Sequence, residues 1–68
     1  MSIREIVINM MDGSPDYNKP MTLKMAAVDV RNIKAEYQAN GEKAPSDLTV
    51  RAYYETWNDI LREARDEK

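Results

Sequence analysis

Apolar residues recur at alternating steps of three and four along three segments of the chain, the spacing of one face of an α-helix. The longest stripe runs through Val50, Tyr53, Trp57, Ile60 and Ala64, with Tyr54 and Leu61 beside it. A second stripe comprises Leu23, Ala26, Val30, Ile33 and Tyr37. A shorter one near the N-terminus comprises Ile3, Ile6, Val7, Met10 and Met11. The pattern predicts three amphipathic helices, although the β-branched run at 6–8 leaves a strand as the alternative for the first segment.

Residues that favour helix ends stand beside these stripes. Ser2 followed by Glu5 is a capping-box pattern, in which the hydroxyl accepts a backbone N–H of the first turn. Thr22 is the expected N-cap of the second helix. Gly13 and Gly41 follow the first two stripes, where a left-handed residue commonly ends a helix. The sequence therefore predicts both boundaries of the first two helices.

The start of the third helix has two interpretations. Either Ser46 or Thr49 can serve as its N-cap. Thr49 is favoured, because Leu48 before it can then pack against Tyr53 as a hydrophobic staple. Ser46 stays open as the alternative.

These elements predict an all-α fold in one small domain spanning residues 1–68. Two long helices, at about 22–40 and 47–66, are joined by a short connection and should form a long antiparallel hairpin. A short N-terminal helix at about 3–11 should pack across this hairpin, because so few helical residues are not stable alone.

The hairpin also implies a register. Tyr37 should lie near Tyr53, and Leu23 near Ile60. The N-terminal helix is expected to cover part of the outward side of the second helix, which carries Met25 and Val28. It is too short to cover that side completely, so we expect part of it to stay open.

Composition excludes several chemistries. The 68 residues contain no Cys and no His, which removes disulfides, thiolate zinc sites and the commonest general base. The formal net charge is −2, unlike the strongly basic surface of a typical nucleic-acid-binding domain. A membrane span is not expected, because the chain has no run of about 18 apolar residues. Without the basic and apolar parts of a signal peptide, the expected compartment is the cytoplasm.

Two polar features resemble functional sites but lack residues that such sites require. Asp12, Ser14, Asp16 and Asn18 alternate like the first ligands of a calcium loop, but the required glycine and the final glutamate are missing. The carboxylates along the third helix alternate with arginines, which is typical of a solvated face. We therefore expect no metal, no cofactor and no catalytic site.

The sequence also contains apolar residues that the predicted core does not require, and these are candidates for contact with a partner. Tyr53 and Trp57 are expected in the core, with Tyr54 at its margin, where aromatic residues often make partner contacts. The candidate partner-binding residues are Met10, Met11, Met25, Val28, Tyr54 and Leu61. They would contact either another protein or a second copy in a homodimer, since small scaffolds without disulfides or metals often oligomerise.

The function that fits these observations is a small non-catalytic protein–protein interaction module, a regulator or inhibitor that acts by occupying a surface. The alternative is a dimeric regulator that binds nucleic acid. That alternative is disfavoured, because the second helix is too long for a helix-turn-helix module and the following connection exceeds a three- to four-residue turn.

Overall fold

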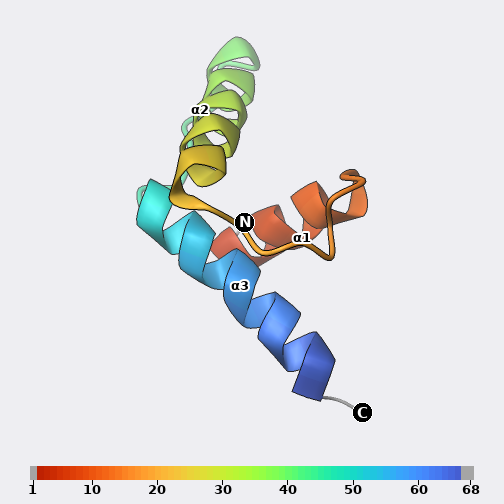
Figure 1. Ribbon diagram of the computed structural model, residues 1–68. Helices are drawn as coiled ribbons and strands as arrows, with labels where there is room; N and C mark the ends of the chain where they lie inside the picture. The colour runs from red at the N-terminus through yellow and green to blue at the C-terminus, as the bar shows by residue number, and fades with distance from the viewer. Residues whose placement is uncertain (1, 67–68) are drawn as a thin grey trace.

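The computed structural model describes residues 2–66, which form three α-helices (Figure 1). These are α1 (Ile3–Asp12), α2 (Leu23–Ala39) and α3 (Val50–Asp66). Residues 2–66 contain no strand, so the predicted all-α class is confirmed and the first segment is a helix. In the described part of the chain, no helix is both long enough and apolar enough to cross a bilayer.

Side-chain contacts establish that α2 and α3 are antiparallel. Tyr53 near the start of α3 contacts Asp29 within α2, while Asn58 further along α3 contacts Met21, which precedes α2. The expected helical hairpin is therefore confirmed. Figure 1 shows that its two arms meet at an angle, so they do not run alongside each other over their full lengths.

The third helix is the centre of the fold. It packs against both α1 and α2, whereas α1 and α2 do not pack against each other. The expectation that the first helix covers the outward side of α2 was therefore wrong. Its buried residues, Ile6, Val7 and Met11, belong to the core shared with α3. Arg4 also forms an ion pair with Glu63 of α3, at 2.7 Å.

The predicted N-caps are present at all three helices. The Ser2 hydroxyl accepts the backbone N–H of Glu5 and donates to the Glu5 carboxylate, both at 3.3 Å. Thr22 accepts from the backbone N–H of Met25 at 3.1 Å. Thr49 accepts from the backbone N–H of Ala52 at 3.1 Å, so α3 begins after Thr49 and not after Ser46.

The two glycines differ in conformation. Gly41 has φ +72°, the expected left-handed residue after α2. Its N–H donates to the carbonyl of Gln38, and the N–H of Glu42 donates to that of Tyr37, which is the Schellman pattern. Gly13 has φ −94° and was wrongly expected to be left-handed. Its N–H still donates to the carbonyl of Met11, which ends α1 without a left-handed residue.

The core lies where the three helices and two connecting segments meet. Tyr53 and Trp57 are buried at its centre, with ring centroids 6.0 Å apart and planes tilted by 37°. Leu48 is also buried, as the staple interpretation requires. The other buried apolar residues are Ile6, Val7, Met11, Met21, Ala26, Val30 and Ile33.

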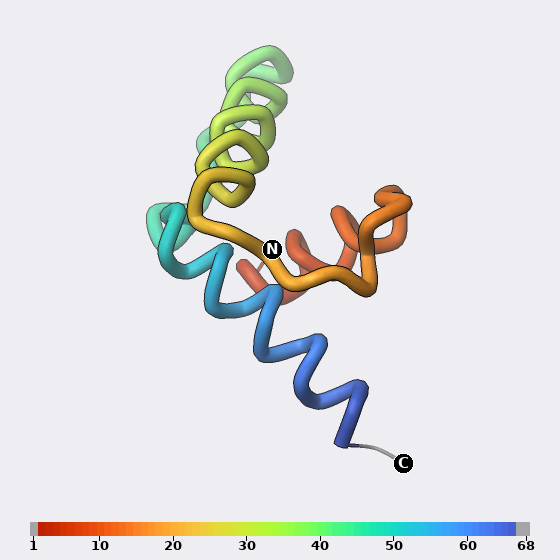
Figure 2. Tube along the Cα trace, in the orientation of Figure 1, coloured from red at the N-terminus to blue at the C-terminus, as the bar shows by residue number. Residues whose placement is uncertain are grey.

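The segment before α2 is fixed to α3 by hydrogen bonds. The indole N–H of Trp57 donates to the carbonyl of Lys19 at 2.9 Å. Asn58 accepts the backbone N–H of Met21 at 2.9 Å and donates to its carbonyl at 3.3 Å. Met21 is therefore buried where Leu23 was expected, and Leu23 is 57% exposed, so the assignment of Leu23 to the core stripe was wrong. Figure 2 shows this segment doubling back from the end of α1 to the start of α2.

Candidate interaction site

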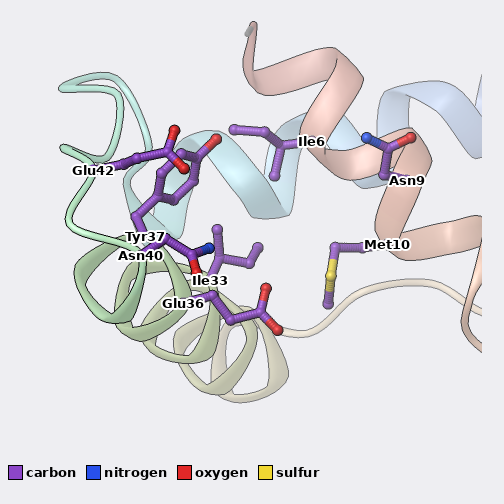
Figure 3. A pocket seen from close by; sticks show the side chains of 8 residues that line it. All are labelled: Ile6, Asn9, Met10, Ile33, Glu36, Tyr37, Asn40 and Glu42. Carbon is purple, nitrogen blue, oxygen red and sulfur yellow. The ribbon is translucent and has the colours of Figure 1, made fainter.

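A cleft of about 220 Å³ lies between α1 and α2, where these helices fail to meet (Figure 3). The lining side chains come from α1, from the second half of α2 and from the turn after it. They are Ile6, Asn9, Met10, Ile33, Glu36, Tyr37, Asn40 and Glu42. The cleft exists because α3 holds each helix separately, which leaves the space between them unfilled.

Helical spacing places most of these residues on the cleft. On α1, Ile6, Asn9 and Met10 are three and four residues apart and so share one face. On α2, Ile33, Glu36 and Tyr37 follow the same rule, and Asn40 is the C-cap that follows them. The last lining residue, Glu42, comes from outside the helix.

Glu42 reaches the cleft through the Schellman turn. The left-handed Gly41 reverses the chain, and the bond from the Glu42 N–H to the Tyr37 carbonyl, at 2.8 Å, holds the reversed backbone against the last turn of α2. Figure 3 shows the side chains of Glu42, Tyr37 and Ile6 at the same end of the cleft. A backbone motif therefore positions one of the two cleft carboxylates.

The cleft combines an apolar floor with an acidic rim. Ile6 and Ile33 are buried and form part of the core, and Met10 and Tyr37 are partly buried against it. Glu36 and Glu42 are exposed, and none of the eight lining residues is basic. The local potential is therefore negative beside an apolar surface.

A second hollow of about 210 Å³ lies beside the segment before α2, and its polar groups already have partners. Asp29 accepts the Tyr53 hydroxyl at 2.9 Å, and the Trp57 N–H is bonded to Lys19. Asp16, part of the partial calcium pattern, pairs with the Lys19 ammonium at 3.3 Å. Within residues 2–66, no cluster of three carboxylates is placed to hold a metal ion.

Two titratable groups with shifted pKa values, Arg4 and Glu63, do not line the cleft. The Arg4 hydrogen bond and charge lower the pKa of Glu63, and the reciprocal interaction raises the pKa of Arg4. Both side chains are about half exposed, so this pair helps orient α1 on α3 and adds little to stability.

The six predicted partner-binding residues do not form one surface. Met10 lines the cleft, whereas Met11 is only 9% exposed and belongs to the core, so its assignment as a surface contact was wrong. Met25 and Val28 are exposed on the outward side of α2, at 51% and 48%. Tyr54 and Leu61 are partly buried against the core along α3.

Sequence reasoning missed the cleft residues other than Met10 as a site. Ile6, Ile33 and Tyr37 were assigned to the core stripes. The one sequence feature that could have predicted part of this site is the Asn40-Gly41-Glu42 turn, because it holds the Glu42 carboxylate beside the last turn of α2.

No family model, curated protein sequence or solved structure matches this chain.

Proposed function

We propose that this chain is a small non-catalytic interaction module that regulates or inhibits another cytoplasmic protein by occupying part of its surface. The observation that carries the proposal is the cleft between α1 and α2, where a buried apolar floor meets two exposed carboxylates. The partner chemistry that fits is an apolar side chain next to a lysine or arginine.

Size supports a protein partner. The cleft volume of about 220 Å³ is below the roughly 300–1,000 Å³ of pockets that enclose small-molecule ligands. It suits one or two side chains projecting from a larger surface. Met10 at its edge is flexible and polarisable, which favours adaptable apolar contacts.

Charge supports a basic flank on that partner. Glu36 and Glu42 carry exposed carboxylates, and neither forms an ion pair within residues 2–66. Complementary charge of this kind speeds association and selects among partners more than it adds affinity. A partner with acidic flanks would place like charges together at the rim.

The test is a titration of the ¹⁵N-labelled chain with two short peptides, followed by NMR. Both peptides carry the same leucine, flanked by lysines in one and by glutamates in the other. We expect the lysine peptide to shift the amides of the cleft residues, with an affinity that falls as salt screens the charges. The glutamate peptide should bind much more weakly.

Two charge-reversal variants make the test specific. Glu42→Lys should lower the affinity for the lysine peptide by about tenfold. Asp66→Lys makes the same charge change at the far end of α3 and should leave binding nearly unchanged. Equal binding of the two peptides, or amide shifts confined to another surface, would contradict the proposal.

A further inference from the structure

The outward side of α2 carries a second apolar stripe, opposite the one in the core. Its members are separated by steps of three, four, three and four, and all are exposed. They are the apolar residues Met25, Val28, Ala35 and Ala39, with the polar Asn32 between Val28 and Ala35. This is the a/d spacing of a two-stranded coiled coil, in which side chains of one helix fit between those of another.

Charged residues border this stripe, with one sign on each edge. Lys24 and Arg31 lie on one edge, and Asp29 and Glu36 on the other. Lys24, Arg31 and Glu36 are exposed, and no ion pair within residues 2–66 involves any of the four. Asp29 accepts the Tyr53 hydroxyl through Oδ2, which leaves Oδ1 free.

We propose that this face of α2 binds the same face of a second copy of the chain, as a parallel two-stranded coiled coil. A two-fold axis parallel to the helices brings the basic edge of one copy against the acidic edge of the other. Lys24 then meets the second copy's Asp29, and Arg31 meets its Glu36, each five residues further along. By symmetry each pair forms twice.

Charge selects the parallel arrangement over the antiparallel one. In an antiparallel pair the two-fold axis is perpendicular to the helices, so like edges meet. Arg31 would then face Arg31 of the other copy, and Asp29 would face Glu36. Like charges in contact are destabilising, so the antiparallel pair is disfavoured.

Asn32 lies at the middle of the seam. A single asparagine at such a position lowers the stability of a coiled coil but fixes its register and its two-stranded state, through a hydrogen bond to the same residue of the partner. The seam spans little more than two heptads and contains two alanines. We therefore expect a reversible dimer with a dissociation constant between about 10 µM and 1 mM.

The first test is sedimentation equilibrium of the full chain over a roughly hundredfold concentration range. The average mass should rise from that of the monomer towards that of the dimer. Arg31→Glu should weaken association by about tenfold, and adding Glu36→Arg to it should restore association to within about threefold. Lys34→Glu reverses a charge on the same helix away from the seam and should have little effect.

Glu36→Arg alone distinguishes the two orientations. In the parallel dimer the introduced arginine faces Arg31 of the other copy and weakens association. In the antiparallel dimer it faces Asp29 and strengthens association, which would overturn the proposal. A single mass of 7.9 kDa at every concentration would overturn it too. Circular dichroism of each variant shows that its helices are intact.

This inference shares Glu36 with the proposed function, since that side chain borders both the cleft and the seam, but the two can be tested separately. The measurement uses the isolated protein without any peptide, and Arg31 does not line the cleft between α1 and α2. A monomeric chain that still binds the lysine peptide would refute the dimer and leave the cleft proposal standing.

Discussion

At the residue scale, Tyr53 connects the apolar core to the charged side chain of Asp29. Its ring is fully buried, and its hydroxyl donates to the Asp29 carboxylate at 2.9 Å. Burial raises the pKa of Tyr53, and the hydrogen bond and negative charge of Asp29 raise it further. The phenol therefore stays protonated in the folded chain at pH values where an exposed tyrosine ionises.

This raised pKa predicts a loss of stability in alkali. The unfolded chain releases the Tyr53 proton at about pH 10, whereas the folded chain retains it, so the free energy of unfolding falls as pH rises above about 10. Tyr53→Phe should lower the free energy of unfolding by about 1 kcal/mol at neutral pH through loss of the hydrogen bond. Urea unfolding of both proteins should show this gap closing above about pH 10. A gap that stays constant there would contradict the assignment.

Two glycines allow a matched comparison of backbone conformation. A Cβ at Gly41 would meet no atom within 4 Å, so Gly41→Ala tests the effect of the left-handed φ of +72° alone. This substitution should lower the free energy of unfolding by about 1 kcal/mol. At Gly13, with φ −94°, a Cβ would lie 3.9 Å from the Asn9 carbonyl oxygen, an ordinary contact. Gly13→Ala should therefore stabilise the chain by about 0.5 kcal/mol. Chemical unfolding measures the free energy of unfolding of each variant. A change in the same direction for both variants, relative to the wild-type chain, would contradict these backbone assignments.

Trp57 links α3 both to the core and to the segment before α2. It is 3% exposed, packs against Tyr53 and donates to the Lys19 carbonyl. Trp57→Ala should cost about 3–5 kcal/mol, most of the stability of a domain this small. Its circular dichroism should show a largely unfolded chain at 25 °C. Two-state unfolding at the wild-type midpoint would mean that Trp57 is not central.

At the element scale, the sequence predicts what neighbouring residues determine. The N-caps Ser2, Thr22 and Thr49 act on amides three residues away, and Gly41 acts on the last turn of its own helix. These local interactions are visible in the spacing of residue types. They explain why the number of helices and nearly all their boundaries were predictable.

The placement of elements depends on contacts between distant residues, and there prediction failed in part. Met21 lies in a segment expected to be a loop, but Asn58, 37 residues later, fixes its backbone on α3 and displaces Leu23 to the surface. Met10 and Met11 both fit the stripe of α1, and periodicity alone could not decide which one is buried. The cleft was unpredictable for the same reason, because it arises where α1 and α2 do not meet.

At the scale of the whole molecule, charge distribution bears on the alternative of a nucleic-acid-binding dimer. The chain has 10 basic residues, and four of them, Arg4, Lys19, Arg51 and Arg62, are paired with carboxylates. On α2, Lys24 and Arg31 border the proposed dimer seam. Because the paired side chains have their charge partly neutralised, we expect only weak attraction between residues 2–66 and a run of phosphates.

This distribution predicts no retention of DNA. Non-specific binding depends on lysines and arginines that displace condensed cations from the phosphates, and it strengthens steeply as salt is lowered. In a gel shift with mixed-sequence duplex at low salt, the wild-type chain should leave the DNA mobility unchanged. The double variant Glu36→Lys and Glu42→Lys replaces two negative charges at the cleft rim with two positive ones, a net change of +4. It serves as the positive control, because it should give some salt-sensitive retention. Retention by the wild-type chain that disappears as salt is raised would favour the nucleic-acid function over the protein-binding cleft.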